Sequence, residues 1–210
     1  MPETPTPPRG RLYVIAAPSG AGKTSLVKAL LERRPELEVS VSYTTRKRRP
    51  TEIDGVDYFF VTRERFHELL AEDAFLEHAE VFDNHYGTSR ERVTQALDAG
   101  RSVVLEIDWQ GARQVRRHMP DCVTIFILPP SRAELERRLR ARRTDDEQVI
   151  ARRLRDSAED MRHWSEFAYV IVNARFDDAL AALERIIDRD GEAYAAGRPE
   201  VTALASTLLG

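Results

Sequence analysis

A glycine-rich turn at residues 17–24 places the strongest constraint on what this chain can fold into. It follows the apolar run Leu12–Ala17 and precedes a pattern of apolar residues with helical spacing. A buried strand, then glycines, then Lys-Thr at the start of a helix is the arrangement of a phosphate-binding loop. Gly20 and Gly22 would let several backbone N–H groups converge on one anion, and the helix N-terminus would strengthen their field. Residues 17–24 are therefore predicted to bind a polyphosphate.

Two side chains of this loop suit nucleotide chemistry. Lys23 would bring a positive charge to the outer phosphates, and the Thr24 hydroxyl would be a ligand for Mg²⁺. Ala17 stands where the general motif has its first glycine. The following helix supports the motif nevertheless, because apolar residues recur there with a period near 3.6: Leu26, Val27, Leu30 and Leu31. The alternative is a glycine-rich strand–helix turn with an exposed lysine.

Strands and helices are predicted to alternate along the rest of the chain. Short apolar runs rich in Val and Ile predict strands at 12–17, 102–107, 122–128 and 168–172. Helical patterns separate them at 111–119, 132–142, 145–164 and 177–190. This alternation is typical of an α/β fold in which helices cover both faces of a parallel sheet. Ligands of such folds bind at the carboxyl ends of the strands, where the glycine-rich turn lies.

Local signals refine three of these helices. Ser131 with Glu134 predicts a capping box. The helix at 145–164 is expected to pack through one face made of Val149, Ile150, Leu154, Ala158 and Met161. The helix at 177–190 follows Asp177 and Asp178, which suit a helix N-terminus. Its predicted buried stripe consists of Leu180, Leu183, Ile186 and Ile187.

Residues 38–90 do not follow this alternation of strands and helices. They hold β-like pieces at 39–43 and 57–61, turn signals, and one helix near 63–71, which predicts an insertion with its own small sheet. Cations and hydroxyls are dense in its first part, as a phosphate dianion requires. Taken alone, the basic run at 46–49 could equally be a solvated basic turn.

Composition excludes several classes of function. The net charge is −3 over 210 residues, so no attraction to nucleic acid or to an anionic membrane is expected. The single cysteine, Cys122, lies in an apolar run and is expected to be a buried small hydrophobe, and the five histidines show no metal-ligand spacing. No signal peptide or membrane-spanning run is apparent, which predicts a cytoplasmic protein. Residues 1–9 are expected to be a disordered leader, and residues 191–210 a tail that is either a docked helix or frayed.

Several motifs together make this chain similar to guanylate kinase. They are residues 17–24, Ser42-Tyr-Thr-Thr-Arg46 with Arg49-Pro50, Gly55 with Asp57-Tyr58, Phe75-Leu-Glu77, Tyr86-Gly-Thr88 and Glu106-Ile-Asp-Trp-Gln-Gly111. The resemblance covers residues 10–190 and implies a P-loop nucleoside-monophosphate-kinase fold. Its implied parts are a core at 10–37, 91–137 and 155–190, a GMP-binding segment at 38–90, and a helical lid at about 138–154.

The resemblance also implies roles for individual residues. The ATP-binding residues would be Ala17, Pro18, Ser19, Gly20, Ala21, Gly22, Lys23, Thr24 and Asn173. The GMP phosphate would be held by Arg46, Arg49, Tyr58 and Tyr86. The guanine base would lie near Ser42, Glu77, Gly87, Thr88 and Asp108. The catalytic cations would be Lys23, Arg138, Arg142 and Arg153, with Thr24 as the protein ligand of Mg²⁺.

Four positions depart from common family patterns. Ala17 is also frequent in the bacterial members. Thr88 stands where many relatives have serine, which keeps the hydroxyl. Glu106 stands where aspartate is usual, and its extra methylene would shift any metal-bound water, which favours Asp108 over Glu106. Arg143 stands where glycine is usual, at the predicted lid turn.

The implied reaction is ATP + GMP ⇌ ADP + GDP, with dGMP as a second acceptor and Mg²⁺ as cofactor. Domains of this kind also occur in scaffold proteins that bind partner peptides without catalysis, and fold resemblance alone does not separate the two. The complete loop with Lys23 and Thr24 and the lid arginines favour the enzyme. A kinase for a different monophosphate is a second alternative, which depends on the base pocket. Whether the chain forms a homo-oligomer is open.

Overall fold

The computed structural model describes residues 8–81, 83–141 and 147–210. The chain divides into two compact units. The first unit comprises Met1–Tyr13, Glu36–Leu105 and Gln110–Cys122, and the second comprises Val14–Pro35, Glu106–Trp109 and Val123–Gly210. The predicted leader falls mostly on residues 1–7, outside the described part, while Arg9 pairs with Asp98 at 2.8 Å.

The central sheet has five strands in the order β2-β7-β1-β8-β9. They are β1 (Leu12–Ala16), β2 (Leu37–Val39), β7 (Ser102–Glu106), β8 (Val123–Leu128) and β9 (Tyr169–Val172). The pairs β2–β7 and β8–β9 are parallel. Every residue of β1 is buried, which explains its unbroken apolar sequence. The predicted α/β fold with a parallel sheet core is confirmed, and each of the four predicted strands is found to within one residue.

Cys122 differs from its prediction. It precedes β8 instead of beginning it, and it is only half-buried. Partial burial raises the pKa of its thiol.

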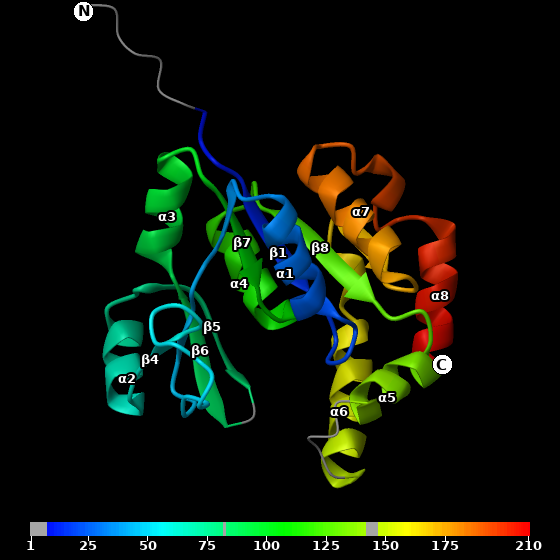
Figure 1. The fold of residues 1–210 in the computed structure, drawn as a ribbon, viewed down its shortest axis with the longest axis horizontal. Coiled ribbons are helices and arrows are strands. Elements are labelled where there is room, and N and C mark those ends of the chain that lie inside the picture. Colours follow the sequence, from blue (N-terminus) through cyan, green and yellow to red (C-terminus); the bar gives the residue numbers. More distant parts are fainter. Residues whose placement is uncertain (1–7, 82, 142–146) are drawn as a thin grey trace, which may run out of the picture. The chain divides into compact units, whose positions relative to one another are not determined.

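The second unit supplies most of the helices around β8 and β9. They are α1 (Lys23–Arg33), α5 (Arg132–Ala141), α6 (Glu147–Met161), α7 (Phe176–Ile187) and α8 (Pro199–Leu209), with short 3₁₀ turns at Trp164–Glu166 and Glu192–Tyr194. Helix α7, orange in Figure 1, packs against β9 and α1. Its predicted stripe is buried in full. Ser131 Oγ accepts a hydrogen bond from Glu134 N at 3.1 Å, which confirms the serine half of the predicted capping box.

Two expectations about this unit need correction or completion. Val149 is exposed at 38%, whereas Ile150, Ser157 and Met161 are buried, so the packed face of α6 is turned away from Val149. The undecided tail contains helix α8, which packs against α6 through a buried face at Val201, Ala205 and Leu208. Arg198, just before α8, donates to Val170 O at 2.9 Å.

The first unit contains a second sheet with the order β4-β3-β6-β5. Its strands are β3 (Tyr43–Thr44), β4 (Phe59–Phe60), β5 (Phe75–Val81) and β6 (Asn84–Ser89), and the helices of this unit are α2 (Arg63–Ala71), α3 (Arg90–Asp98) and α4 (Trp109–His118). The predicted small sheet and the helix at 63–71 are therefore present. Thr62 begins α2 by accepting a hydrogen bond from Arg65 N.

The predicted β-like piece at 39–43 is not one strand. Val39 ends β2 in the central sheet, and Tyr43 begins β3 in the small sheet. The small sheet is anchored by an aromatic core in which Phe66 stacks on Phe75 at 4.6 Å between ring centroids. Two strands that the sequence did not predict, β5 and β6, form its longest antiparallel pair.

Candidate active site

The glycine-rich turn adopts the backbone of a phosphate-binding loop. Gly20 and Gly22 have φ angles of 90° and 97°, which L side chains rarely adopt. A Cβ atom on Gly22 would also lie 2.5 Å from Asn173 Nδ2. Only glycine fits this position, because the turn needs both the positive φ and the close approach of Asn173.

Lys23 and Thr24 begin α1, and both contact the segment that follows β7. Lys23 Nζ donates to Ile107 O at 2.9 Å. The Thr24 hydroxyl donates to a carboxylate oxygen of Glu106. Glu106 therefore supplies a carboxylate at Thr24, and the role expected of Asp108 stays a prediction.

Asn173 and Arg138 converge on the carbonyl of Ala21. Asn173, at the end of β9, is 4% exposed and donates through Nδ2 to Ala21 O at 2.7 Å. Arg138 donates to Ala21 O at 3.4 Å and to Asn173 O at 3.0 Å. Arg138 also pairs with Glu134 at 2.7 Å, and the neighbouring Arg137 and Arg138 lower the pKa of Glu134 to about 2. These contacts hold the far side of the loop in shape.

Of the other lid arginines predicted to be catalytic, only Arg153 lies among the described residues. Arg153 lies half-buried on α6. Arg142 and Arg143 fall at 142–146, outside the described residues. The predicted lid boundaries at about 138–154 therefore stay a prediction.

A buried cluster on α6 was missed by sequence reasoning. Ser157 Oγ donates to Ser19 O of the loop at 3.1 Å. One turn further along, the pKa of Asp160 is raised to about 7, mainly by burial and next by the charge of Asp108, although Trp109 and the charge of Lys23 oppose the shift. The Trp109 ring stacks on His163 at 3.5 Å between centroids. The one sequence signal was Trp109 itself, since a buried indole N–H needs an acceptor.

In the first unit, three predicted base-pocket residues form a hydrogen-bonded chain. Thr88 Oγ1 donates to Glu77 Oε1 at 2.5 Å, and the Ser42 hydroxyl lies 3.4 Å from Thr88 Oγ1. Because Thr88 gives its only proton to Glu77, Ser42 must donate to Thr88. Glu77 is 4% exposed and Thr88 fully buried. A carboxylate can accept several hydrogen bonds, so the bond from Thr88 does not by itself exhaust the acceptor capacity of Glu77.

Glu77 is held in place by strand β5 and by helix α4. Gln114 accepts from His78 N at 3.1 Å and donates to His78 O at 2.7 Å. His118 Nδ1 lies 3.0 Å from Leu76 O. Gly87 of β6 pairs with His78 of β5. A side chain at this position would clash, because a Cβ there would lie 2.8 Å from the Phe75 ring.

The predicted phosphate ligands also gather in the first unit. The Arg46 guanidinium lies over the Tyr58 ring at 5.5 Å, and the rings of Tyr58 and Tyr86 are 5.9 Å apart. Arg46 pairs with Glu52 at 2.7 Å and Arg49 lies 3.9 Å from the same carboxylate. Glu52 was not singled out from the sequence.

Asp108 is the one predicted GMP-binding residue that belongs to the second unit. The negative charge of Asp108 raises the pKa of Asp160. The grouping of Asp108 with Ser42, Glu77 and Thr88 stays a prediction.

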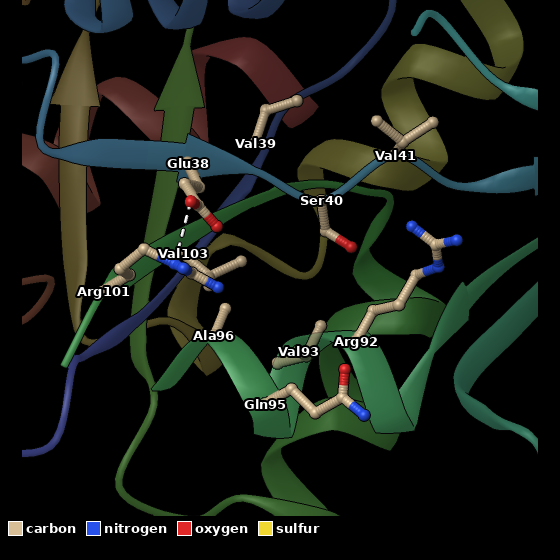
Figure 2. A pocket seen from close by; sticks show the side chains of 10 residues that line it. All are labelled: Glu38, Val39, Ser40, Val41, Arg92, Val93, Gln95, Ala96, Arg101 and Val103. Carbon is tan, nitrogen blue, oxygen red and sulfur yellow. Dashed lines mark ion pairs between the residues drawn. The ribbon is translucent and has the colours of Figure 1, made fainter. Parts of the chain in front are cut away.

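Two cavities of the first unit contain none of the predicted substrate ligands. One, of about 220 Å³, lies between β2 with the residues after it and α3; the ion pair of Arg101 with Glu38 spans 2.9 Å at its edge (Figure 2). It is smaller than the usual volume of a drug-sized ligand site, roughly 300–1,000 Å³. The other, of about 590 Å³, is lined by residues of α2, β5 and α3.

Within residues 8–81, 83–141 and 147–210, no group of three or more His, Cys, Asp or Glu side chains is arranged to hold a metal ion. Among the same described residues, no helix is both long and apolar enough to cross a membrane.

A parallel sheet whose first strand leads into a P-loop and its helix, with a small second sheet inserted in the chain, defines a P-loop nucleoside monophosphate kinase fold. The family model for guanylate kinase matches residues 9–190. The guanylate kinase of Methylococcus capsulatus is 54% identical over 202 residues, covering 96% of this chain and 99% of that protein. That of Escherichia coli K12 is 51% identical over 203 residues, covering 96% and 98%. A crystal structure of guanylate kinase from Anaplasma phagocytophilum superposes with a TM-score of 0.73 at 36% identity, covering 89% of this chain and 88% of the other. The chain belongs to the guanylate kinase family.

Proposed function

We infer that this chain transfers the γ-phosphoryl group of ATP to GMP, giving ADP and GDP. A phosphate oxygen of GMP attacks the γ-phosphorus, the new P–O bond forms in line with the breaking bond, and ADP leaves. The observation that carries this inference is the buried Glu77–Thr88–Ser42 chain in a member of the guanylate kinase family that also keeps a complete P-loop.

On the ATP side, the backbone of residues 17–22 would cradle the phosphates, and Lys23 would neutralise charge on the outer ones. Lys23 Nζ would exchange its bond to Ile107 O for phosphate oxygens. Asn173 supports this role indirectly, because it fixes the Ala21 carbonyl. The ATP-binding set is Ala17, Pro18, Ser19, Gly20, Ala21, Gly22, Lys23, Thr24 and Asn173.

Enzymes of this family generally work with a divalent metal, and we propose Mg²⁺. The Thr24 hydroxyl and the Glu106 carboxylate that accepts its hydrogen bond are hard oxygen donors, which suit this ion. Thr24 would bind the ion and Glu106 would orient Thr24 or a metal-bound water. When bound, the ion would neutralise charge on the phosphate oxygens.

On the GMP side, Glu77 would accept the two adjacent donors of guanine, N1–H and the exocyclic amine. Adenine presents an acceptor at N1, so its lone pair would oppose the carboxylate. Ser42, Gly87, Thr88 and Asp108 would complete the base contacts. Arg46, Arg49, Tyr58 and Tyr86 would hold the phosphate of GMP through charge-assisted hydrogen bonds.

The remaining catalytic cations would be Arg138, Arg142 and Arg153. Arg138 is supported by its position beside the P-loop carbonyl of Ala21. They would stabilise charge that develops on the transferring phosphoryl group.

A peptide-binding scaffold without catalysis would not need Lys23, Thr24 and Arg138 around one loop. ATP and GMP are drawn from the nucleotide pool of the cytoplasm, which we propose as the compartment. The test is a coupled assay of ADP release with purified protein, ATP and Mg²⁺. Turnover that requires GMP would support the proposal, and its absence would favour a scaffold.

A further inference from the structure

The Glu52 carboxylate lies at the centre of the predicted phosphate ligands. It accepts hydrogen bonds from Arg46 Nη2 at 2.7 Å and Arg46 Nη1 at 3.2 Å. It also accepts from the backbone N–H of Arg49 at 2.7 Å, and the Arg49 guanidinium lies 3.9 Å away. One carboxylate thus contacts both arginines that would bind the GMP phosphate.

This pair differs from the surface ion pairs of the same unit. The Arg46 and Glu52 side chains are 18% and 13% exposed, whereas those of Arg65 and Glu68 on α2 are 49% and 60% exposed. Fork-like arginine–carboxylate pairs are directional, and shielding from water strengthens them. The hydrogen bond to Arg46 lowers the pKa of Glu52, and the same bond raises the pKa of Arg46, so both are charged at neutral pH.

Glu52 is also part of its own backbone turn. Glu52 N donates to Arg49 O at 3.1 Å while its carboxylate accepts from Arg49 N. If the carboxylate moved away to make room for a phosphate, the turn would lose one of these two bonds. The carboxylate is therefore better suited to remain in place than to act as a displaceable mimic of the phosphate.

The other contacts of Arg46 point to the same role. The Arg46 guanidinium lies over the rings of Tyr58 and Phe60 at 5.5 and 5.8 Å. Its Nη1 also donates to Lys47 O at 2.8 Å. Glu52 and Lys47 O therefore hold the two Nη atoms of a guanidinium that lies beside these aromatic rings.

We propose that Glu52 is a positioning residue that holds Arg46 and the Arg49 turn in the orientation needed to receive the phosphate of the monophosphate substrate. This inference rests on the proposed function, because it takes Arg46 and Arg49 to be phosphate ligands. Immobilising long side chains on binding costs affinity, and pre-ordering them removes that cost. Glu52 would thus act on the binding of GMP and hardly on the chemical step.

The test is the Glu52→Gln variant, which keeps the volume but turns an amide donor toward one of the arginine or backbone donors. The expected result is a rise in KM for GMP of about tenfold, as for the loss of order in one or two long side chains, with kcat changed by less than about twofold. The matched control is Glu68→Gln, which removes the acid of the exposed Arg65–Glu68 pair and should leave both constants unchanged. An unchanged KM in Glu52→Gln overturns the proposal, and a lowered KM shows that Glu52 competes with phosphate.

Two further measurements separate this inference from the proposed function. Inhibition by guanosine, which lacks the phosphate, should be equally strong in Glu52→Gln and the parent; an equal weakening for guanosine and GMP would show a general structural defect and overturn the positioning role. Arg46→Met should raise KM for GMP at least as much. If it does so while Glu52→Gln does not, only the positioning role fails. If neither Arg46→Met nor Glu52→Gln changes KM, the phosphate site itself is misassigned.

If Glu52→Gln does not fold, Glu52→Asp provides the same test. It keeps the charge but is too short to reach Arg46 and Arg49 N together. A rise in KM for GMP of a few-fold is expected, and an unchanged KM overturns the proposal.

Discussion

The two units hold their proposed substrate-binding side chains with different kinds of partner. In the second unit the acceptors are mostly main-chain oxygens: Lys23 donates to Ile107 O, and Asn173 donates to Ala21 O. In the first unit two central acceptors are side-chain carboxylates: Thr88 donates to Glu77, and Arg46 donates to Glu52 as well as to Lys47 O. Thr24, which donates to Glu106, and Arg138, which donates to Glu134 as well as to main-chain oxygens, use side-chain carboxylates in the second unit too.

This difference has a consequence for mutation. A main-chain oxygen persists whatever residue carries it, so the geometry around the P-loop tolerates substitution of most neighbours. A carboxylate is lost with one substitution, and its buried donors are then left unpaired at a cost of about 1–3 kcal/mol each. In the first unit, substitution of the acids that hold the proposed ligands should therefore lower activity. In the second unit, the largest losses should come from substitution of the proposed substrate-binding side chains.

The largest effect is expected at Lys23, in the second unit. Lys23→Met keeps the length and helix propensity but removes the charge from the loop, and loss of one such contact typically lowers the rate by ~10²–10³. Steady-state ADP release measures it. Lys28→Met, on the exposed face of the same helix, is the control. Turnover of Lys23→Met within a few-fold of the parent would show that residues 17–24 do not bind ATP in the proposed way.

The next effect concerns Glu77, the acid of the first unit that is proposed to bind the guanine base. Glu77→Gln can accept one guanine donor but turns its own donor toward the second or toward Thr88. Since hydrogen bonds to charged groups contribute about 1.5–3 kcal/mol, kcat/KM for GMP should fall by roughly 10- to 100-fold. Glu80→Gln, an exposed change on the same strand, should be neutral. An unchanged KM for GMP in Glu77→Gln would remove Glu77 from the base pocket.

A smaller effect is expected for Arg138. Arg138→Ala removes a cation beside the loop, but Asn173 still holds Ala21 O. We expect kcat to fall about tenfold or more and KM for GMP to change little, because the charge would act mainly in the transition state. Arg140→Ala, on the same helix but paired with Glu136 and Glu147, is the comparison. An equal loss in Arg140→Ala would show that general basicity is responsible. The same pair of measurements applies to Arg142→Ala.

The smallest effect concerns the pH dependence of stability. Two acids, one in each unit, have shifted pKa values, and the two shifts have opposite signs. Arg46 holds the pKa of Glu52 below its usual range, whereas burial raises the pKa of Asp160 to about 7. Between the ordinary carboxyl value near 4 and pH 7, the folded protein holds a proton on Asp160 that the unfolded chain has lost. Stability contributed through Asp160 therefore falls as the pH rises through this window and is constant above it.

Asp160→Asn removes that ionisation and should raise Tm by about 2–4 °C at pH 8 for each kcal/mol regained, with a much smaller change at pH 4. Thermal unfolding at the two pH values measures it. A Tm gain for Asp160→Asn that is the same at pH 4 and pH 8 would contradict the assignment of this pKa.

The parts of the fold that sequence predicted well are those that a local pattern determines. β1 and β8 are continuous apolar runs because both faces are buried, and α2 begins at its Thr62 cap. β5 and β6 were missed because their sequences mix polar and apolar residues, and their pairing with each other makes them strands. Neither strand shows by its own sequence that it will pair with the other.

The candidate site divides in the same way. Motif residues such as Lys23, Glu77 and Arg46 were found because their neighbours in sequence identify them. Their supports were not: Gln114 holds β5 from a helix 36 positions away, and Ser157 contacts Ser19 across 138 positions. Glu52 lies only six positions from Arg46, but a Glu in a basic turn has no pattern that distinguishes a partner from a solvated charge.

The most direct test of the account is substrate choice among nucleoside monophosphates. ADP release is measured with ATP and Mg²⁺ and with GMP, dGMP, AMP, CMP or UMP as acceptor. A site that hydrogen-bonds the guanine edge through Glu77 should use GMP and dGMP and reject AMP by as much as ~10⁴ in kcat/KM, because the buried carboxylate would be left facing lone pairs. Comparable kcat/KM values for GMP and AMP would contradict it.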